Sequence, residues 1–126
     1  MKKLLHGVMF VAAVSPITGR AFEPYGATAF ELAQLPQECR DKYQGKNSEI
    51  WSTKFGEGWL HWHHYCDGLR FIMRANTSTD KESRRYNLGV ARGNFQYVLE
   101  HTSPNYFMRK PIEMQVRAID VRLKQR

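Results

Sequence analysis

Four residues of the types that bind transition metals lie within six positions of this chain, at His61, His63, His64 and Cys66. On a helix, residues three apart share a face, so His61 lies beside His64 and His63 lies beside Cys66. No single face carries three of the four residues. Imidazole nitrogen and thiolate sulfur are ligands that zinc and copper prefer. One hypothesis is therefore a small exported copper- or zinc-binding protein that uses His61, His64 and Cys66, with His101 or Cys39 as a further ligand.

The two cysteines, Cys39 and Cys66, offer a competing interpretation. In an oxidising compartment such a pair is expected to close a disulfide, and the loop between them gives a stabilisation of about 3 kcal/mol. A disulfide-bonded sulfur cannot act as a thiolate ligand, so the disulfide and the metal site exclude each other at Cys66. Two unpaired buried thiols are the alternative. Without a metal, the histidines are expected to pack with tryptophans between two helices.

Catalysis has little support in the sequence. A reactive Cys66 thiolate beside a histidine would be oxidised outside the cytoplasm. The carboxylate of Asp67 is explained more simply as an i,i+3 partner of Arg70. Glycine-rich phosphate loops, nucleophile elbows and paired carboxylates at acid/base spacing are absent from the sequence. We therefore expect neither an enzyme nor a cofactor.

The first 21 residues have the composition of a signal peptide. Lys2 and Lys3 are followed by an apolar stretch over 4–17 and by small residues at Gly19 and Ala21. That stretch is too short and too interrupted for a transmembrane helix, which needs about 20 apolar residues. We expect cleavage near Ala21, a periplasmic or secreted domain over 22–126, and no later membrane segment; an uncleaved anchor is the alternative.

The charge of the chain is moderately basic. Its 126 residues suffice for one domain, and its formal net charge is +7. Removing Lys2, Lys3 and Arg20 from the 19 basic residues leaves an excess of +4 over the 12 acids. This excess is scattered apart from short clusters at 84–85, 109–110 and 122–126, so nucleic-acid binding is not expected. A contact with an acidic protein or an anionic membrane surface stays open.

Apolar residues repeat at spacings of three and four, which predicts helices and no strands. Short helices are expected at 37–43 and 48–55, and longer ones over 59–75, from a Thr79 cap to about His101, and from Pro111 onward. The helix over 59–75 has a polar face that contains Arg70 and Arg74. In the next helix, Gly89 and Gly93 leave room for a close neighbour. The predicted class is all-α, built from antiparallel helical hairpins.

Several of these residues resemble exported bacterial tetratricopeptide-repeat (TPR) proteins over about 35–123. The resemblance lies in the run 61–69 and in Arg84-Arg85-Tyr86, Phe95-x-Tyr97-Val98-Leu99 and Ser103-Pro104. It implies TPR-like helix pairs of about 34 residues each. The residues that would match the repeat are Gly68 and Phe71 in the first helix, Ala91 and Phe95 in the second, and Pro104 after it. Ala118 and Val121 would be weaker matches in a following unit.

The resemblance implies a scaffold that binds another protein through helix packing. The candidate partner-binding residues are Tyr97, Tyr106, Phe107, Ile112, Val116, Ile119 and Leu123. Of these, Tyr97 and Tyr106 are expected to be partly exposed. The last helix carries an apolar stripe formed by Ile112, Val116, Ile119 and Leu123. This stripe must fold back on the preceding hairpin, self-associate or receive a partner. The leading hypothesis is a periplasmic TPR-like adaptor whose partner is a protein or peptide of the cell envelope; a purely architectural envelope subunit is a further alternative.

Overall fold

A computed structural model describes residues 26–125 of the chain. These residues form helices and no strands, which confirms the predicted all-α class. The expected signal peptide lies outside the described residues. The helices are α1 (Ala29–Gln34), α2 (Gln37–Gln44), α3 (Ser48–Phe55), the 3-10 helix η2 (Gly56–His61), α4 (Trp62–Thr77), α5 (Lys81–Glu100) and α6 (Arg109–Lys124).

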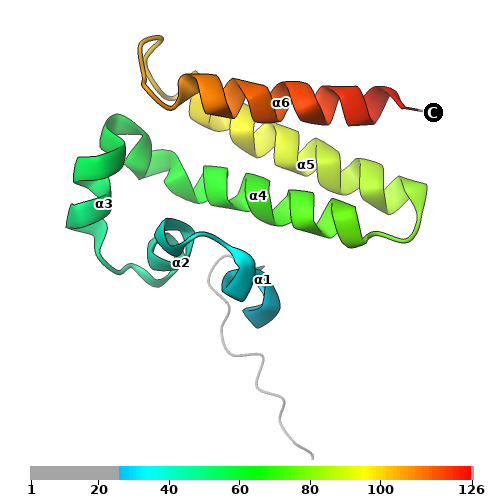
Figure 1. Cartoon of the computed structure of the whole chain (residues 1–126), viewed down its shortest axis with the longest axis horizontal. Coiled ribbons are helices and arrows are strands. Elements are labelled where there is room, and N and C mark those ends of the chain that lie inside the picture. Colours follow the sequence, from blue (N-terminus) through cyan, green and yellow to red (C-terminus); the bar gives the residue numbers. More distant parts are fainter. Residues whose placement is uncertain (1–25, 126) are drawn as a thin grey trace, which may run out of the picture.

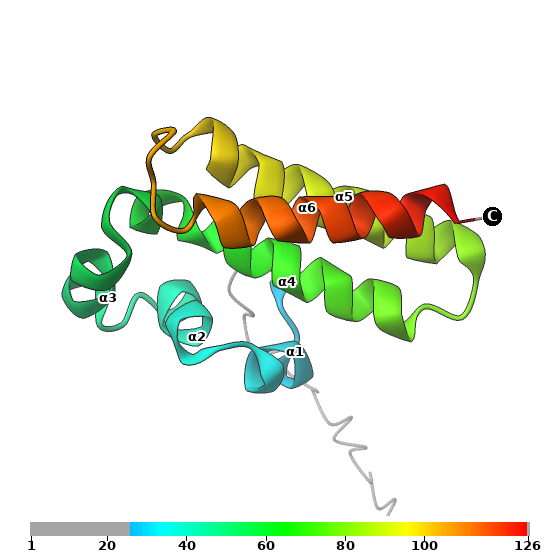
Figure 2. The same ribbon diagram turned by 45° about the horizontal axis from the view of Figure 1, so that its top comes forward.

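The three long helices make up most of the molecule. Figure 1 shows α5 beside both α4 and α6, and the packing of α5 on each of them provides the main helix contacts. The short helices α1 and α2 lie on the other side of α4, and Figure 2 shows the same arrangement from a second direction. No helix within residues 26–125 is both long enough and apolar enough to cross a bilayer.

The contact between α4 and α5 depends on a glycine. A Cβ atom at Gly68 would lie 2.6 to 2.8 Å from three ring atoms of Phe95, whose side chain is fully buried. The ring of Phe95 therefore occupies the space that any larger residue at position 68 would need. Ala91, one turn earlier on α5, is also fully buried. Gly68 therefore permits the close approach of α4 and α5.

The prediction that Gly89 and Gly93 accommodate a close neighbour is wrong. Both residues are exposed on α5, and a Cβ atom at either position would meet nothing within 4 Å. These two glycines lie on the solvent side of α5, so they lower its helical propensity without a gain in packing.

The last helix folds back on α5, the first of the three possibilities stated for its apolar stripe. Ile112, Val116 and Ile119 are buried with exposed fractions of 0%, 8% and 1%, and Leu123 is partly buried at the end of the stripe. Asp120 accepts a hydrogen bond from the Arg92 guanidinium at 2.6 Å across the same interface. These apolar residues therefore belong to the core of the domain.

Three helix starts differ from prediction. Helix α6 begins at Arg109 and not at Pro111. The side chain of Asp80, and not that of Thr79, caps α5 by accepting a hydrogen bond of 2.7 Å from the Ser83 amide. The helix expected from Trp59 begins at Trp62, because the preceding residues form η2. All three differences shift a boundary by one turn or less and leave the hairpin between α4 and α5 intact.

Candidate functional site

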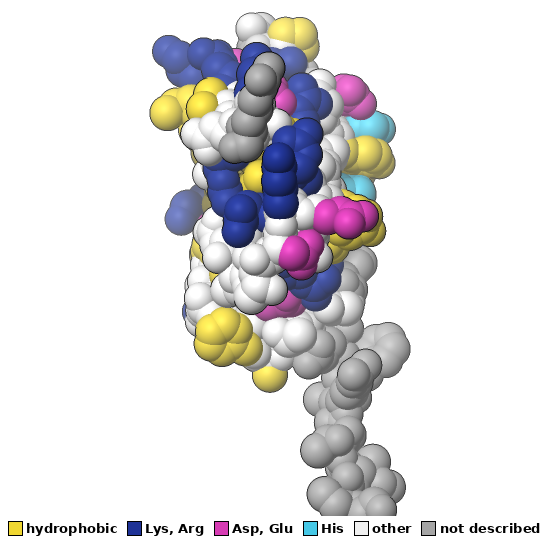
Figure 3. Space-filling view, turned by 90° about the vertical axis from the view of Figure 1, so that its right-hand side faces the viewer, with side chains coloured by type: hydrophobic (Ala, Val, Ile, Leu, Met, Phe, Trp, Pro, Cys, Tyr) yellow, Lys and Arg dark blue, Asp and Glu magenta, His cyan; other side chains and the backbone are white. Residues whose placement is uncertain are grey.

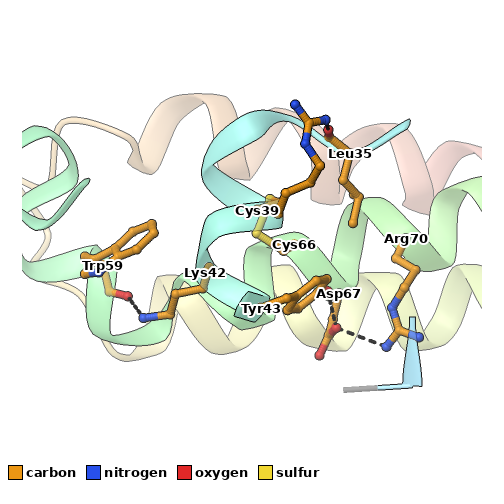
Figure 4. The surroundings of a disulfide bond; sticks show 9 residues. Leu35, Cys39, Lys42, Tyr43, Trp59, Cys66, Asp67 and Arg70 are labelled. Atoms are coloured by element: carbon orange, nitrogen blue, oxygen red, sulfur yellow. Dashed lines mark hydrogen bonds and ion pairs between the residues drawn. A yellow bond between two sulfur atoms is a disulfide. The ribbon is translucent and has the colours of Figure 1, made fainter. Parts of the chain in front are cut away.

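The predicted disulfide is present. Cys39 on α2 and Cys66 on α4 are bonded, with their Cα atoms 5.4 Å apart, and both side chains are fully buried. Figure 4 shows the bond where α2 crosses α4, beside the Tyr43 hydroxyl, which donates a hydrogen bond of 2.5 Å to Asp67. The bond fastens the amino-terminal helices to the hairpin. It also removes the Cys66 thiolate from the hypothetical metal site.

Charged side chains of α4 reinforce this attachment. Arg70 donates to Asp67 at 3.0 Å, as expected from their i,i+3 spacing, and also to the backbone oxygen of Gly26 at 3.0 Å. Arg74 forms a two-pronged contact with Glu31 of α1, with distances of 2.5 and 3.1 Å. Burial alone would raise the pKa of Glu31, but hydrogen bonds from Arg74 and from the Thr28 amide and the charges of both arginines lower it. Part of the expected polar face of α4 is therefore covered, and Arg70 is only 4% exposed.

The histidines of the hypothetical metal site form an aromatic cluster with Tyr97. The Tyr97 ring is stacked on His101, with centroids 3.7 Å apart, and lies 3.9 Å from the ring of His64. The His61 ring lies 5.1 Å from that of His101, and the Nδ1 atom of His64 lies 2.9 Å from the Asn94 side-chain oxygen. Tyr97 is partly buried, so its predicted partial exposure is confirmed.

Burial and nearby positive charges favour the neutral imidazole at His61 and His63. Burial and the positive charges that His101, His64 and Lys42 can carry lower the pKa of His61. Burial lowers the pKa of His63 as well, with His64 and Lys42 adding to the effect. Among residues 26–125, no group of three or more histidine, cysteine or acidic side chains has an arrangement suited to a metal ion. The set His61, His64 and Cys66 does not form a site, because Cys66 is bonded to Cys39.

The prediction that Tyr106 is partly exposed is wrong. Its side chain is 6% exposed, and its hydroxyl donates a hydrogen bond of 2.7 Å to the backbone oxygen of Phe55. A Cβ atom at Gly58 would lie 2.1 Å from that hydroxyl, so the close approach requires glycine at position 58. Burial, with a smaller effect of the Glu57 charge, raises the pKa of Tyr106 to about 12. Tyr106 fastens the loop before α6 to η2.

Three other proposed partner-binding residues are also buried. Ile112, Val116 and Ile119 contact the rest of the core, so no folded copy of the chain offers them to a partner. Their assignment to a binding surface is corrected for this reason. Phe107 remains available, since it is 61% exposed in the loop that leads into α6.

The structure instead exposes the opposite side of α6. A second apolar stripe runs along this helix at spacings of three and four, formed by Pro111, Met114, Ala118 and Val121. Met114 and Val121 are 64% and 60% exposed, and a shallow hollow of about 490 Å³ lies over the first three residues with Lys110 and Gln115. We call these four residues the outer stripe. The spacing of these residues can be read from the sequence. The buried stripe of the same helix is more strongly apolar, however, and only that stripe was predicted.

Basic residues follow one edge of the outer stripe. Lys110, Arg117 and Lys124 recur every seven positions, which places them in a row along α6. The side chain of Arg117 is 75% exposed and reaches Glu113 only at 3.8 Å. The outer face of α6 is therefore apolar with a basic margin.

These features define a class of protein, namely a small helical domain with an internal disulfide, in which the outer face of α6 is apolar with a basic margin. A more specific relationship does not emerge from comparison. No protein-family model matches the chain, and neither a curated protein nor a solved structure matches it.

Proposed function

We propose that the protein is an exported helical adaptor that binds a partner protein through the outer stripe of α6. The observation that carries this proposal is the line of apolar residues that remains exposed after α6 has packed on α5. Single exposed apolar residues are ordinary, whereas an aligned set along three turns of one helix offers a groove for a second helix. Covering Met114 and Val121 would remove apolar area from water, which drives association.

The charge beside the stripe indicates the chemistry of the partner. Lys110, Arg117 and Lys124 would face the edge of a helix laid along the stripe, so that edge is expected to be acidic. A second copy of the chain fits less well. In an antiparallel pair related by a two-fold axis, the basic edge of one α6 would face the basic edge of the other. We therefore favour a different protein with an amphipathic, acidic helix.

The proposal extends to a TPR-like arrangement of the long helices. The α4–α5 hairpin would be one TPR-like helix pair and α6 the first helix of a following unit, with the partner helix stacked where an array continues. The fit of Gly68 against Phe95 supports this relation, since small residues at such positions let paired helices approach. The buried disulfide supports export to an oxidising compartment such as the periplasm. The role is binding, with no reaction assigned.

Site-specific photo-crosslinking in the cells that produce the protein tests the proposal. A photoreactive residue at Val121 is expected to yield one defined adduct with a second protein. Met114→Glu, which adds a charge to the stripe beside the crosslinking position, should abolish the adduct. Ile50→Glu is the matched control, because Ile50 on α3 is 65% exposed and lies outside the outer stripe.

Three results would contradict the proposal. The first is the absence of any adduct from Val121, and the second is an adduct that Met114→Glu leaves unchanged. The third is an adduct that contains only two copies of this chain, because it would show that the outer stripe binds a second copy and not a different protein. Circular dichroism of each purified variant shows that a lost adduct does not reflect unfolding.

A further inference from the structure

A group of cations surrounds a small hollow at the end of the bundle where α4 turns into α5 and α6 ends. Figure 3 shows Lys and Arg side chains gathered around this hollow on the face at the right of Figure 1. The hollow has a volume of about 190 Å³ and is lined by Lys81, Arg84, Arg85, Leu88, Arg122 and Gln125. We call it the basic pocket.

The fold creates this pocket from two charge clusters that are far apart in the sequence. The Arg85 guanidinium donates a hydrogen bond of 2.6 Å to the backbone oxygen of Leu123, 38 residues further along, and so holds the end of α6 against the start of α5. Arg84 donates to the Ser78 oxygen at 3.3 Å. A guanidinium has five N–H donors, so each arginine keeps further donors after these bonds. The basic excess that looks scattered in the sequence is therefore partly concentrated here.

The pocket lacks the acidic partners that arginines have elsewhere in the domain. Arg70, Arg74, Arg92 and Arg109 each form an ion pair with a carboxylate. In contrast, no ion pair within residues 26–125 includes any of the four cations of the basic pocket, and no acid of that range lines it.

The neighbouring acids are engaged elsewhere. Asp80 caps α5 by accepting a hydrogen bond from the Ser83 amide. This bond and a hydrogen bond with the Ser83 hydroxyl lower the pKa of Asp80, and the Arg84 charge adds a smaller effect. Glu82 lines a separate hollow with Tyr86 and Asn87. The amino-terminal end of α5 and the carboxyl-terminal end of α6 meet here, so their opposite partial charges offset each other and the four cationic side chains supply the positive charge. Like charges gathered in this way repel one another, and an anion in the pocket would remove that repulsion.

We propose that the basic pocket binds a phosphomonoester group. Guanidinium groups offer paired donors that match two phosphate oxygens at once, and three such groups from two helices suit the several oxygens of a phosphate better than the two of a carboxylate. Leu88, whose side chain is 2% exposed, closes the bottom of the pocket as part of the core. The site is independent of the outer stripe and of the adaptor role.

Titration of the purified domain with glycerol 3-phosphate tests the proposal, followed through the arginine Nε–H signals in NMR spectra. Saturable shifts of Arg84 and Arg122 are expected. The double substitution Arg84→Gln and Arg122→Gln should weaken binding about tenfold or more, because each charged hydrogen-bond donor contributes substantially. Arg85 is left unchanged, since it also holds the end of α6. The control is Lys110→Gln with Arg117→Gln, which removes the same charge outside the pocket and should preserve the affinity.

A second arm distinguishes a soluble phosphate from a lipid headgroup. Co-sedimentation uses phosphatidylcholine vesicles with and without phosphatidic acid. Sedimentation that requires both phosphatidic acid and the intact pocket assigns the site to a lipid, whereas binding of glycerol 3-phosphate alone assigns it to a soluble ester. Equal loss of binding in the pocket and control variants, equally tight binding of succinate, or binding in neither arm would overturn the proposal.

Discussion

Replacing Gly68 with alanine is predicted to destabilise the domain, although alanine is the better helix former. The added Cβ atom would lie 2.6, 2.7 and 2.8 Å from the Cζ, Cε1 and Cε2 atoms of Phe95. Carbon atoms in contact prefer separations of about 3.5 to 4.0 Å, so the ring would have to move by roughly 1 Å. Phe95 is fully buried and is surrounded by core residues on its other sides. The movement would therefore be passed on to α5.

The expected magnitude follows from two opposing effects. Overpacking of a filled core costs about 1 to 3 kcal/mol, and replacing glycine by alanine within a helix returns about 0.5 to 1 kcal/mol. The net loss in the free energy of unfolding is therefore about 1 kcal/mol, within a range of roughly 0 to 2.5 kcal/mol. For a domain of this size each kcal/mol lowers the melting temperature by about 4 to 8 °C.

Urea denaturation followed by circular dichroism, with the disulfide intact, measures the effect. The matched control is Gly89→Ala on α5, where the new Cβ atom meets nothing within 4 Å and should stabilise by about 0.5 to 1 kcal/mol. Adding Phe95→Leu to the Gly68 variant should recover part of the loss, so the two substitutions should not be additive. A Gly68 variant as stable as the Gly89 variant would refute the packing described for α4 and α5.

Three further results are expected. Burial, aided by neighbouring cationic groups, lowers the pKa values of His61 and His63, so the unfolded chain binds more protons; the free energy of unfolding should fall as the pH drops through 6.5. This fall should be smaller in a variant with His61→Gln and His63→Gln. Identical pH profiles of stability for this variant and the unchanged protein would contradict the prediction. Replacing both cysteines by serine should cost roughly 3.5 kcal/mol in urea denaturation, since the bond closes a loop with a separation of 27 residues; an unchanged midpoint would argue against the bond. Tyr106→Phe should cost about 1 kcal/mol by removing the hydrogen bond from the Tyr106 hydroxyl to the Phe55 oxygen, and a fully stable variant would contradict that hydrogen bond.

The helices were predictable where local patterns specify them. Apolar spacing correctly predicts α4, α5 and α6 as long helices, and the short helix expected at 48–55 is α3. The disulfide was predictable from the number of cysteines and the expected compartment. These features depend on neighbours in the sequence or on simple chemistry, so no knowledge of the tertiary arrangement is needed.

The exposure of individual side chains was not predictable in the same way. Tyr106 is buried because the loop before α6 folds onto η2, and Arg70 is buried because the amino-terminal segment covers α4. Both contacts join segments more than 40 residues apart, and no local pattern encodes them. The face of α6 that packs on α5 was likewise misassigned to a partner, since periodicity identifies an apolar stripe but not what covers it.

The basic pocket shows the same limit for charge. Arg85 and Arg122 are distant in sequence, and only the antiparallel return of α6 along α5 brings them to one hollow. Composition gives the size of the basic excess, whereas topology determines where it is concentrated.

Oxidation of methionine by hydrogen peroxide, read by mass spectrometry, tests most directly whether the outer face of α6 is a docking surface. In the purified domain Met114, at 64% exposed, should be oxidised well before Met73 and Met108, which are partly buried against the core. In intact cells Met114 should be protected relative to the purified domain, because the partner covers it. Equal oxidation of Met114 in cells and in the purified domain would contradict the account.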